Sequence, residues 1–378
     1  MSAKKPIRVA VTGFRGIPAT WGGIEHHCES LYSRLAAKGY DITIYARRHY
    51  VKDPVDFYKG MHIKRLNSLK SKGLEAFSHT FWSVLHILKD RPDIIHFHAQ
   101  GPTIFSWLPR FLTPRSRIFF TCHGLDWQRK KWSKMASAVI RMGELASVYF
   151  PHYRIAVSKT LKADYESRLG VRAHYIPNGV DIPPATDAEH IEALGLKSRG
   201  YFLFVGRIVP EKRIEDLISA YLARPHKYGL VIVGDTAGDQ AYLDKLKKAA
   251  KNNPAVRFVG YQFGQALAQL FANARAFVSA SELEGLPITL LEALSYGLPC
   301  IASNIAPHRE VMEAVDGFMF EVKKVDALAV WLDKLEETSD NTLKTFSKRA
   351  KTVINDHYNW DRIAEAHDNL YQSCRAKR

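Results

Sequence analysis

The sequence lacks several features that would assign it to a secreted, metal-bound or membrane-spanning class. Its 378 residues include only four cysteines, and these are scattered without the close spacing of a metal site or a disulfide framework: Cys28, Cys122, Cys300 and Cys374. No run of about eighteen apolar residues occurs, so no membrane-spanning helix is expected. The opening Met-Ser-Ala-Lys-Lys-Pro does not have the pattern of a signal peptide. We therefore expect a protein of a reducing cytoplasm.

The sequence also lacks the Gly-x-Gly-x-x-Gly fingerprint, although a strand, a glycine-rich loop, a helix and a second strand follow one another over residues 7–46. This order is the opening of a Rossmann domain, and the missing fingerprint disfavours a dinucleotide oxidoreductase. Gly22 and Gly23 stand at the start of the expected helix 24–38, where the backbone can approach a phosphate. Paired glycines are also common in ordinary turns.

Acidic residues are scarce in the first half of the chain. Residues 1–180 contain 29 Lys and Arg against 12 Asp and Glu, a balance of +17, and the remainder has 25 against 26, or −1. The excess indicates an anionic partner for the first half: nucleic acid, acidic lipid headgroups or a phosphorylated acceptor. The length favours two domains, and the apolar content of 46% is that of a globular protein.

The most informative stretch is 279–303, which lies between two expected strands, 276–278 and 300–302. It contains a Gly-Pro turn and an apolar helix expected over 289–296, with Pro287 at the first helical position. The free amides around Ile288 would form an anion site. Glu284 precedes the helix and Glu292 lies inside it, so a diphosphate with a sugar at each end would suit the stretch. Each Glu by itself is more often a capping or solvated acid.

The string Glu-Gly-Leu-Pro, four residues and Glu, then Ala-Leu-x-x-Gly-Leu-Pro resembles the signature of family 4 of the retaining glycosyltransferases. The resemblance implies an α/β protein with the GT-B fold: two Rossmann-like, doubly wound domains facing a cleft and a C-terminal helix that crosses back to the first domain. It implies an acceptor domain over 1–182, a nucleotide-sugar domain over 183–357 and a returning helix over 358–378, with Trp360 as its anchor.

The same resemblance implies roles for individual residues. Glu284 positions the transferred sugar, Glu292 binds the ribose, and Arg207 with Lys212 stabilises the departing diphosphate. The remaining residues implied at the donor are Gly22, Gly23, His123, Leu286, Pro287 and Ile288. The chain contains no Asp-x-Asp, the usual metal-holding motif of metal-dependent transferases, so we expect fixed cations to replace a metal, and no cofactor.

Histidines near two strand ends have alternative interpretations. His96 and His98 share one face of a strand, and in the absence of a third ligand we favour a polar strand end over a metal site. Cys122 and His123 are adjacent on an expected strand, so they point in opposite directions and do not form a nucleophile pair. In the family that the chain resembles, a His-Gly at the position of His123 lies beside the transferred sugar.

One aromatic and basic segment predicts either an exposed helix start or a surface that rests on acidic lipid; its residues are Trp127, Arg129, Lys130, Lys131, Trp132 and Lys134. Together with the opening Gly-Phe-Arg-Gly-Ile-Pro, this segment is similar to a subgroup that includes bacterial polysaccharide rhamnosyltransferases.

The sequence therefore predicts a retaining glycosyltransferase that moves a hexosyl or deoxyhexosyl group in cell-surface polysaccharide synthesis. The expected donor is a UDP-, GDP- or dTDP-sugar, the acceptor a glycan or a lipid-linked glycan, and the location cytoplasmic with peripheral attachment to an acidic membrane. The alternatives are a non-catalytic protein that binds polyanions or nucleic acid, and a GT-B sugar-nucleotide epimerase. No base-stacking or groove-reading motif supports nucleic acid as the partner.

Overall fold

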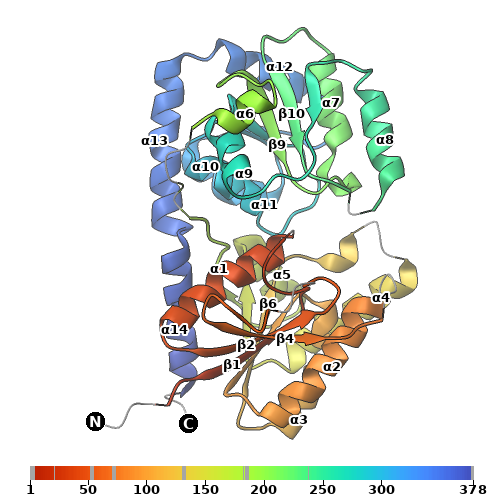
Figure 1. Ribbon diagram of the computed structural model, residues 1–378, viewed down its shortest axis with the longest axis vertical. Coiled ribbons are helices and arrows are strands. Elements are labelled where there is room, and N and C mark those ends of the chain that lie inside the picture. Colours follow the sequence, from red (N-terminus) through yellow and green to blue (C-terminus); the bar gives the residue numbers. More distant parts are fainter. Residues whose placement is uncertain are drawn as a thin grey trace. The chain divides into compact units, whose positions relative to one another are not determined.

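The computed structural model describes residues 5–20, 22–51, 55–69, 74–129, 133–181, 183, 187–236 and 238–375. Its internal contacts divide the chain into two compact units, shown with their elements in Figure 1. Unit 1 takes the chain up to Asn178 and again from Trp360 onward, and unit 2 is Gly179–Asn359. The sequence predicted these boundaries after residues 182 and 357.

Unit 1 contains a sheet in the order β3-β4-β2-β1-β5-β6-β7-β8. All neighbours are parallel except β3 and β4. The chain changes its winding direction between β1 and β5, as in a doubly wound fold. The strands are β1 Arg8–Thr12, β2 Asp41–Arg47, β3 Phe57–Tyr58, β4 Met61–Leu66, β5 Ile94–His98, β6 Arg117–Cys122, β7 Tyr153–Ala156 and β8 His174–Tyr175.

The helices of unit 1 include two short ones, η1 and α3, that the sequence did not predict. The first of these, η1, fits against α4 because Gly143, in the middle of α4, has no side chain: a Cβ there would lie 2.2 Å from the carbonyl oxygen of Gln100. The helices are α1 Gly23–Ala37, α2 Leu74–Asp90, η1 Gly101–Phe105, α3 Trp107–Leu112, η2 Asp126–Gln128, α4 Lys134–Tyr149, α5 Lys159–Arg168 and α14 Trp360–Arg375.

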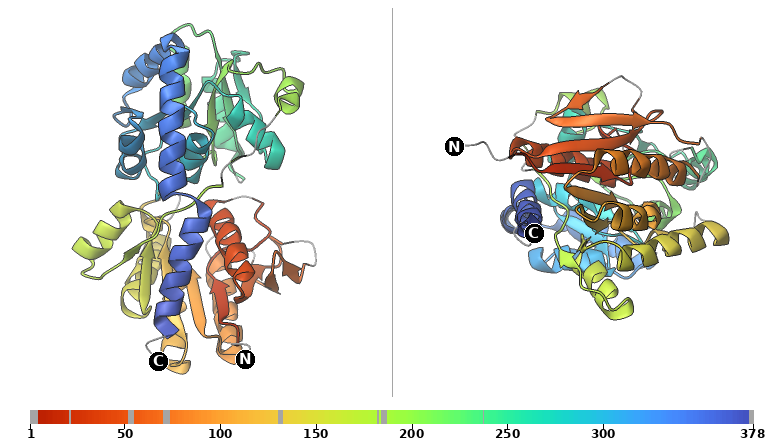
Figure 2. Two further views of the ribbon diagram at one scale, coloured as in Figure 1. Left: turned by 90° about the vertical axis from the view of Figure 1, so that its left-hand side faces the viewer. Right: turned by 90° about the horizontal axis from the view of Figure 1, so that it is seen from below.

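The last helix, α14, belongs to unit 1 although the chain reaches it from unit 2. It lies beside α1, as the left view of Figure 2 shows. Trp360 is only 4% exposed and packs in the core of unit 1, so the expected anchor is confirmed. An ion pair between Arg34 and Asp361, with 2.8 Å between nitrogen and oxygen, ties the two helices at the surface.

Unit 2 contains a six-stranded, wholly parallel sheet in the order β11-β10-β9-β12-β13-β14. Counted along the chain this is 3-2-1-4-5-6, the Rossmann order. The central strands β9, β12 and β13 are buried on both faces, which explains their largely apolar sequences, whereas the edge strand β11 carries an exposed Arg257. The strands are β9 Tyr201–Val205, β10 Gly229–Val233, β11 Val256–Phe258, β12 Ala276–Ser279, β13 Cys300–Ser303 and β14 Phe318–Phe320.

Helices connect these strands and cover the sheet. They are α6 Glu189–Ala193, η3 Pro210–Lys212, α7 Ile214–Leu222, α8 Gln240–Ala249, α9 Gly264–Ala272, α10 Ile288–Ser295, α11 Ala306–Met312, η4 Glu313–Val315, α12 Val325–Glu337 and α13 Asp340–His357. Within the described residues, no helix has both the length and the apolar character needed to cross a membrane.

Candidate active site

Two of the residues predicted to handle the donor, Lys212 and Glu284, meet at one point of unit 2. Strands β9 and β12 are parallel neighbours, and they are the first and fourth strands in chain order. The winding direction reverses between them, and ligands of such sheets bind outside the carboxyl ends of the strands at this place. The loops after the two strands meet there, because the amide of Glu282 donates to the carbonyl of Glu211 at 2.9 Å.

Lys212 and Glu284 form an ion pair across these loops, with 2.5 Å between Nζ and Oε1. Their side chains are 15% and 12% exposed, so the pair is largely shielded yet still reaches the surface. Burial alone would raise the pKa of Glu284, but the Lys212 charge and hydrogen bonds from Lys212 and Ser281 outweigh it and lower that pKa. Glu284 is therefore an ionised acceptor at neutral pH.

A polar cluster supports this pair, and the sequence analysis did not identify it. His308, on α11, has a buried ring with two polar contacts. Its Nδ1 lies 2.8 Å from the carbonyl oxygen of Ser303, and its Nε2 lies 3.4 Å from the hydroxyl oxygen of Ser279. Ser279 in turn lies 3.3 Å from Ser281, oxygen to oxygen. Burial lowers the pKa of His308 to about 4, so the ring is neutral. The cluster fixes the loop that carries Glu284 without adding a second positive charge.

Helix α10 begins one residue earlier than predicted, at Ile288. Pro287 is the capping residue rather than the first helical one, because its ψ of 110° is still extended. Its carbonyl already accepts from the amide of Leu290, at 3.2 Å. Leu286 is buried and Ile288 half-buried. The first amides of a helix have no partner within the helix, and binding of an anion by those of α10 stays a prediction.

Glu292 lies in the second turn of α10 and is half-buried. Burial raises the pKa of its carboxyl to about 7. Among the described residues, no cation or hydrogen-bond donor is paired with this carboxylate. A half-buried carboxylate without such a partner is costly for the fold. This cost is consistent with a carboxylate whose hydrogen-bond donors belong to a bound ligand. Arg207, also half-buried, follows β9 by two residues.

In unit 1, the glycine loop that precedes α1 is held by an acid. Gly22 caps α1 with a φ of +106°, and a Cβ at this position would lie 2.1 Å from a carboxylate oxygen of Glu25. The other oxygen of Glu25 accepts from the amide of Arg15 at 3.1 Å. Gly22 is thus required by the fold itself, and Gly23 is the first residue of α1. Whether either glycine approaches a phosphate stays a prediction.

His123 is half-buried just after β6 and ends a chain of hydrogen bonds that runs through unit 1. Its Nε2 lies 2.8 Å from Nδ1 of His98, whose Nε2 lies 2.7 Å from the hydroxyl of Tyr32. That hydroxyl lies 2.9 Å from Nδ1 of His96. Burial lowers the pKa of His123 to about 3, so the ring is neutral and can donate to or accept from a sugar.

This series of hydrogen bonds bears on the expectation that His96 and His98 form a polar strand end. Both are fully buried with hydrogen-bond partners, and they are not a strand end that faces solvent. A group with metal-ligating geometry includes His98 but not His96: ligand nitrogens of His27, His98 and His123 lie within 4.8 Å of one another. Residues far apart in sequence form this group, so spacing alone could not reveal it.

The predicted membrane segment is only partly described, because Lys130, Lys131 and Trp132 lie outside the described residues. Trp127 is half-buried, and its indole donates to Glu144 Oε1 at 3.2 Å. Arg129 pairs with Asp126, with 2.9 Å between nitrogen and oxygen. Lys134 begins α4 and is exposed.

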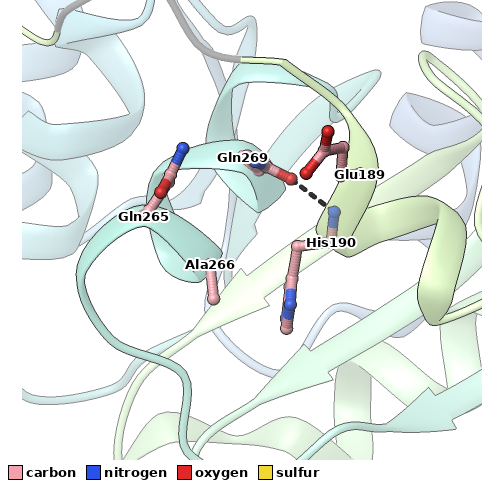
Figure 3. A pocket seen from close by; sticks show the side chains of 5 residues that line it. All are labelled: Glu189, His190, Gln265, Ala266 and Gln269. Carbon is pink, nitrogen blue, oxygen red and sulfur yellow. Dashed lines mark hydrogen bonds between the residues drawn. The ribbon is translucent and has the colours of Figure 1, made fainter.

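A separate pocket of about 290 Å³ lies between α6 and α9, as Figure 3 shows. Its wall is polar, and the amide of His190 donates to Gln269 Oε1 at 2.7 Å. The other lining residues are Glu189, Gln265 and Ala266. None of them belongs to the predicted site, so the pocket carries no part of the chemistry considered below.

Two family models match the chain, one over each half. The model described as Glycosyltransferase Family 4 matches residues 21–182, and the one described as Glycosyl transferases group 1 matches residues 187–353. Together they cover most of both units.

Individual relatives agree with these models. An O-antigen chain mannosyltransferase B of Escherichia coli is 26% identical over 54% of this chain, and the match spans only 53% of that protein. A UDP-Gal:alpha-D-GlcNAc-diphosphoundecaprenol alpha-1,3-galactosyltransferase of the same organism is 27% identical over 75% of this chain and 76% of its own. Neither is named as a rhamnosyltransferase, so closeness to that subgroup stays a prediction.

The fold has a solved counterpart. The sucrose-phosphate synthase of Thermosynechococcus elongatus superposes with a TM-score of 0.85 at 22% identity, over 98% of this chain and 100% of that one. With the Rossmann order of unit 2, the returning α14 and the two family matches, the chain is identified as a member of the family 4 glycosyltransferases with the GT-B fold.

Proposed function

We propose that this protein transfers a sugar, with retention at the anomeric carbon, from a nucleotide-sugar held mainly by unit 2 to an acceptor held by unit 1. The Lys212–Glu284 ion pair carries the proposal, because it places a cation and an ionised carboxylate at the reversal point of the unit 2 sheet. A departing diphosphate needs the cation, and a sugar hydroxyl is a donor for the carboxylate.

In the proposed reaction, the bond between the anomeric carbon and the diphosphate oxygen breaks. The acceptor oxygen forms the new bond on the same face of the sugar, and its proton passes to the diphosphate. Lys212 and Arg207 stabilise the charge that develops on the leaving diphosphate. Glu284 holds the sugar, the first amides of α10 bind phosphate oxygens, and Glu292 binds the ribose. His123 lies beside the sugar, in the role that the resemblance implies.

The relatives narrow the choice of substrates. A mannosyltransferase and a UDP-Gal-dependent galactosyltransferase favour a hexose as the transferred group. The acceptor in the name of the second relative is a sugar on diphosphoundecaprenol. We therefore propose a lipid-linked glycan as acceptor, with the enzyme attached peripherally to the inner face of the membrane. Neither a nucleic-acid-binding protein nor an epimerase finds support in these relatives.

The proposal can be tested with a panel of UDP-, GDP- and dTDP-sugars, using slow hydrolysis in the absence of acceptor as the readout. A retaining transferase should release the nucleoside diphosphate from one donor, with the free sugar first formed in the donor's anomeric configuration. An epimerase would return a different nucleotide-sugar without net release. If no donor is turned over or bound, the proposed function is wrong.

Exchanging Glu292 for Gln should weaken the binding of free UDP or GDP about tenfold at pH 8, because a charge-assisted bond to the ribose becomes a neutral one. The pKa of about 7 means that the wild-type carboxyl is increasingly protonated below neutral pH. The difference between variant and wild type should therefore shrink toward pH 6. Calorimetric titration with UDP or GDP measures the affinity at pH 8 and at pH 6. The control is Glu337→Gln, which changes an exposed acid on α12. Unchanged affinity at pH 8 would remove Glu292 from the nucleotide site.

The same exchange should stabilise the free enzyme. The folded-state pKa of Glu292 lies above the ordinary value of 4.5. Burial of the charged carboxylate therefore lowers the free energy of unfolding fully above about pH 7 and not at all below about pH 4.5. Glu292→Gln should raise the free energy of unfolding by about 1–3 kcal/mol at pH 8, with a smaller gain at pH 5. Denaturant unfolding of variant and wild type at pH 8 and pH 5 tests whether the exchange stabilises the protein and whether the gain is smaller at pH 5.

Activity should survive removal of divalent metals, because Arg207 and Lys212 supply the positive charge at the leaving group. Dialysis against EDTA, followed by assay with the preferred donor, should leave at least about half of the turnover. The His27, His98 and His123 nitrogens are the described group with metal-ligating geometry. Loss of activity on chelation and recovery with Mg²⁺ or Mn²⁺ would contradict the expectation, and recovery with Zn²⁺ alone would point to these histidines.

A further inference from the structure

The exposed apolar side chains of this protein are concentrated on three helices of unit 1. In the described part of the chain, seventeen large apolar side chains are exposed, and thirteen of them belong to α2, α3 and α4. They are Leu74, Phe77, Phe81, Trp82, Leu85, Trp107, Phe111, Leu112, Met135, Val139, Met142, Leu145 and Tyr149. Scattered exposed apolar residues are ordinary, but one contiguous group of this size marks an interaction surface.

Helix α2 departs from the usual amphipathic arrangement, because its exposed side is mostly apolar while its buried side mixes Val84 and Ile87 with polar residues. Its outward side carries Phe81 and Trp82, which are 36% and 50% exposed. Its buried side includes polar residues such as Thr80 and Ser83, whose hydroxyls donate to carbonyls of the same helix at 2.8 Å. A helix of a protein surrounded only by water normally places its apolar residues inward. The pattern of α2 therefore suits a non-aqueous surrounding on its outer side.

Helix α4 has a similar arrangement: Ile140 and Val148 are buried, yet its exposed side is also largely apolar. Its exposed residues recur at intervals of three and four along the helix, which forms a stripe from Met135 to Tyr149. Its buried side includes Glu144, which accepts from Arg168 at 2.7 Å and from Gln100 at 2.9 Å. The buried acid is thus satisfied by the protein, whereas Met142, 56% exposed, has no comparable cover.

The three helices form one face. In Figures 1 and 2 they gather on one side of unit 1, away from α1 and α14, and η1 packs against both α2 and α4. The ring of Phe105, in η1, lies 4.6 Å from Phe77 and 5.6 Å from Phe81, centroid to centroid. The rings of Phe111 and Phe150 lie 6.2 Å apart and join α3 to the end of α4.

Cations outnumber unpaired acids on these helices. The three helices contain three acids, and each is paired: Glu75 with Arg47, Asp90 with Lys64, and Glu144 with Arg168. Four cations remain on the same helices, namely Lys89, Arg110, Lys134 and Arg141. Apolar side chains flanked by cations complement the interface of a bilayer that contains acidic lipids.

We propose that α2, α3 and α4 insert their apolar face into the interfacial layer of an anionic membrane. This inference rests on the proposed function for the lipid-linked acceptor, and it names the surface that brings the enzyme to that acceptor. It also changes the expected mode of attachment. For the 127–134 segment, cations with two added indoles predict binding that falls steeply with salt, whereas a large inserted apolar face holds the protein at high ionic strength.

The experiment is flotation of the full chain with vesicles of phosphatidylcholine, with and without about one third phosphatidylglycerol, in 0.1 and 0.5 M NaCl. Binding to the anionic vesicles should persist at 0.5 M NaCl. The triple variant Trp82→Ser, Phe111→Ser and Met142→Ser should reduce partitioning at least about tenfold at both salt concentrations. The matched control, Phe57→Ser with Leu69→Ser and Val330→Ser, removes three exposed apolar residues outside the three helices and should bind like the wild type.

Two results would overturn the proposal. One is binding that disappears entirely at 0.5 M NaCl, or that is the same for the triple variant and wild type. The other is absence of vesicle binding together with a concentration-dependent dimer, by sedimentation, that the triple variant abolishes; the face would then bind a second copy. Hydrolysis of a soluble donor, measured on the same preparations, reports the proposed function separately. It should be unchanged in both triple variants, whose substitutions lie outside the residues assigned to catalysis.

Discussion

Exchanging Glu284 for Gln should lower kcat by roughly 30- to 150-fold, equivalent to about 2–3 kcal/mol of lost transition-state stabilisation. The carboxylate is ionised, and it is fixed by Lys212 at 2.5 Å and by the polar cluster around His308. Gln keeps the size of the side chain but offers a sugar hydroxyl only a neutral acceptor. The loss should appear in kcat with the chosen donor and acceptor, while the affinity for free nucleoside diphosphate stays within about threefold.

The control is Glu282→Gln, two residues earlier in the same loop. The carboxylate of Glu282 lies 3.8 Å from Lys323, whose own side chain is 60% exposed, and a long ion pair with one exposed partner contributes little. Its turnover should remain close to that of the wild type. A Glu284→Gln enzyme with normal kcat, or one in which only nucleotide affinity falls, would show that Glu284 does not hold the sugar.

Exchanging Lys212 for Met should have the larger effect, a fall in kcat of about 100- to 1000-fold, which is typical when one fixed group that stabilises developing charge is removed. Met retains the unbranched chain and deletes the ammonium. Lys323→Met, which removes an exposed lysine from the same unit, is the matched control and should change kcat less than twofold. If Lys212→Met leaves kcat within tenfold of the wild type, the leaving diphosphate is stabilised elsewhere, and Arg207 would be the next residue to exchange.

The pH profile of Lys212→Met distinguishes a role in catalysis from a loss of fold. Lys212 is the main attractive influence that holds the pKa of Glu284 down against burial. Without it, burial dominates and the pKa rises, so Glu284 becomes protonated as the pH falls toward that higher value. The residual kcat of the variant should therefore rise from pH 6 to pH 8 more steeply than that of the wild type. If kcat of the variant changes with pH in parallel with that of the wild type, Lys212 does not control the pKa of Glu284.

Much of the active site could be predicted from the sequence because it is local. The strand, Gly-Pro turn and helix around Glu284 and Glu292 lie within one continuous stretch, and the termini of its helix follow from Gly and Pro within one residue. The alternation of strands and helices likewise predicts the doubly wound units. The pairing of Lys212 with Glu284 joins two loops 72 residues apart, and it was not predicted: the resemblance implied a separate role for each residue.

The sequence by itself thus determined the fold class, because periodicity and turn residues act over a few positions, and the resemblance of one continuous motif indicated the family. Only the tertiary structure decided which distant groups meet, as in the support that His308 gives the Glu284 loop and in the chain from Tyr32 to His123. It also decided which face of α2 and α4 is covered. A helical pattern reports that a helix has an apolar side, but only the packing of its neighbours determines whether that side is buried or exposed.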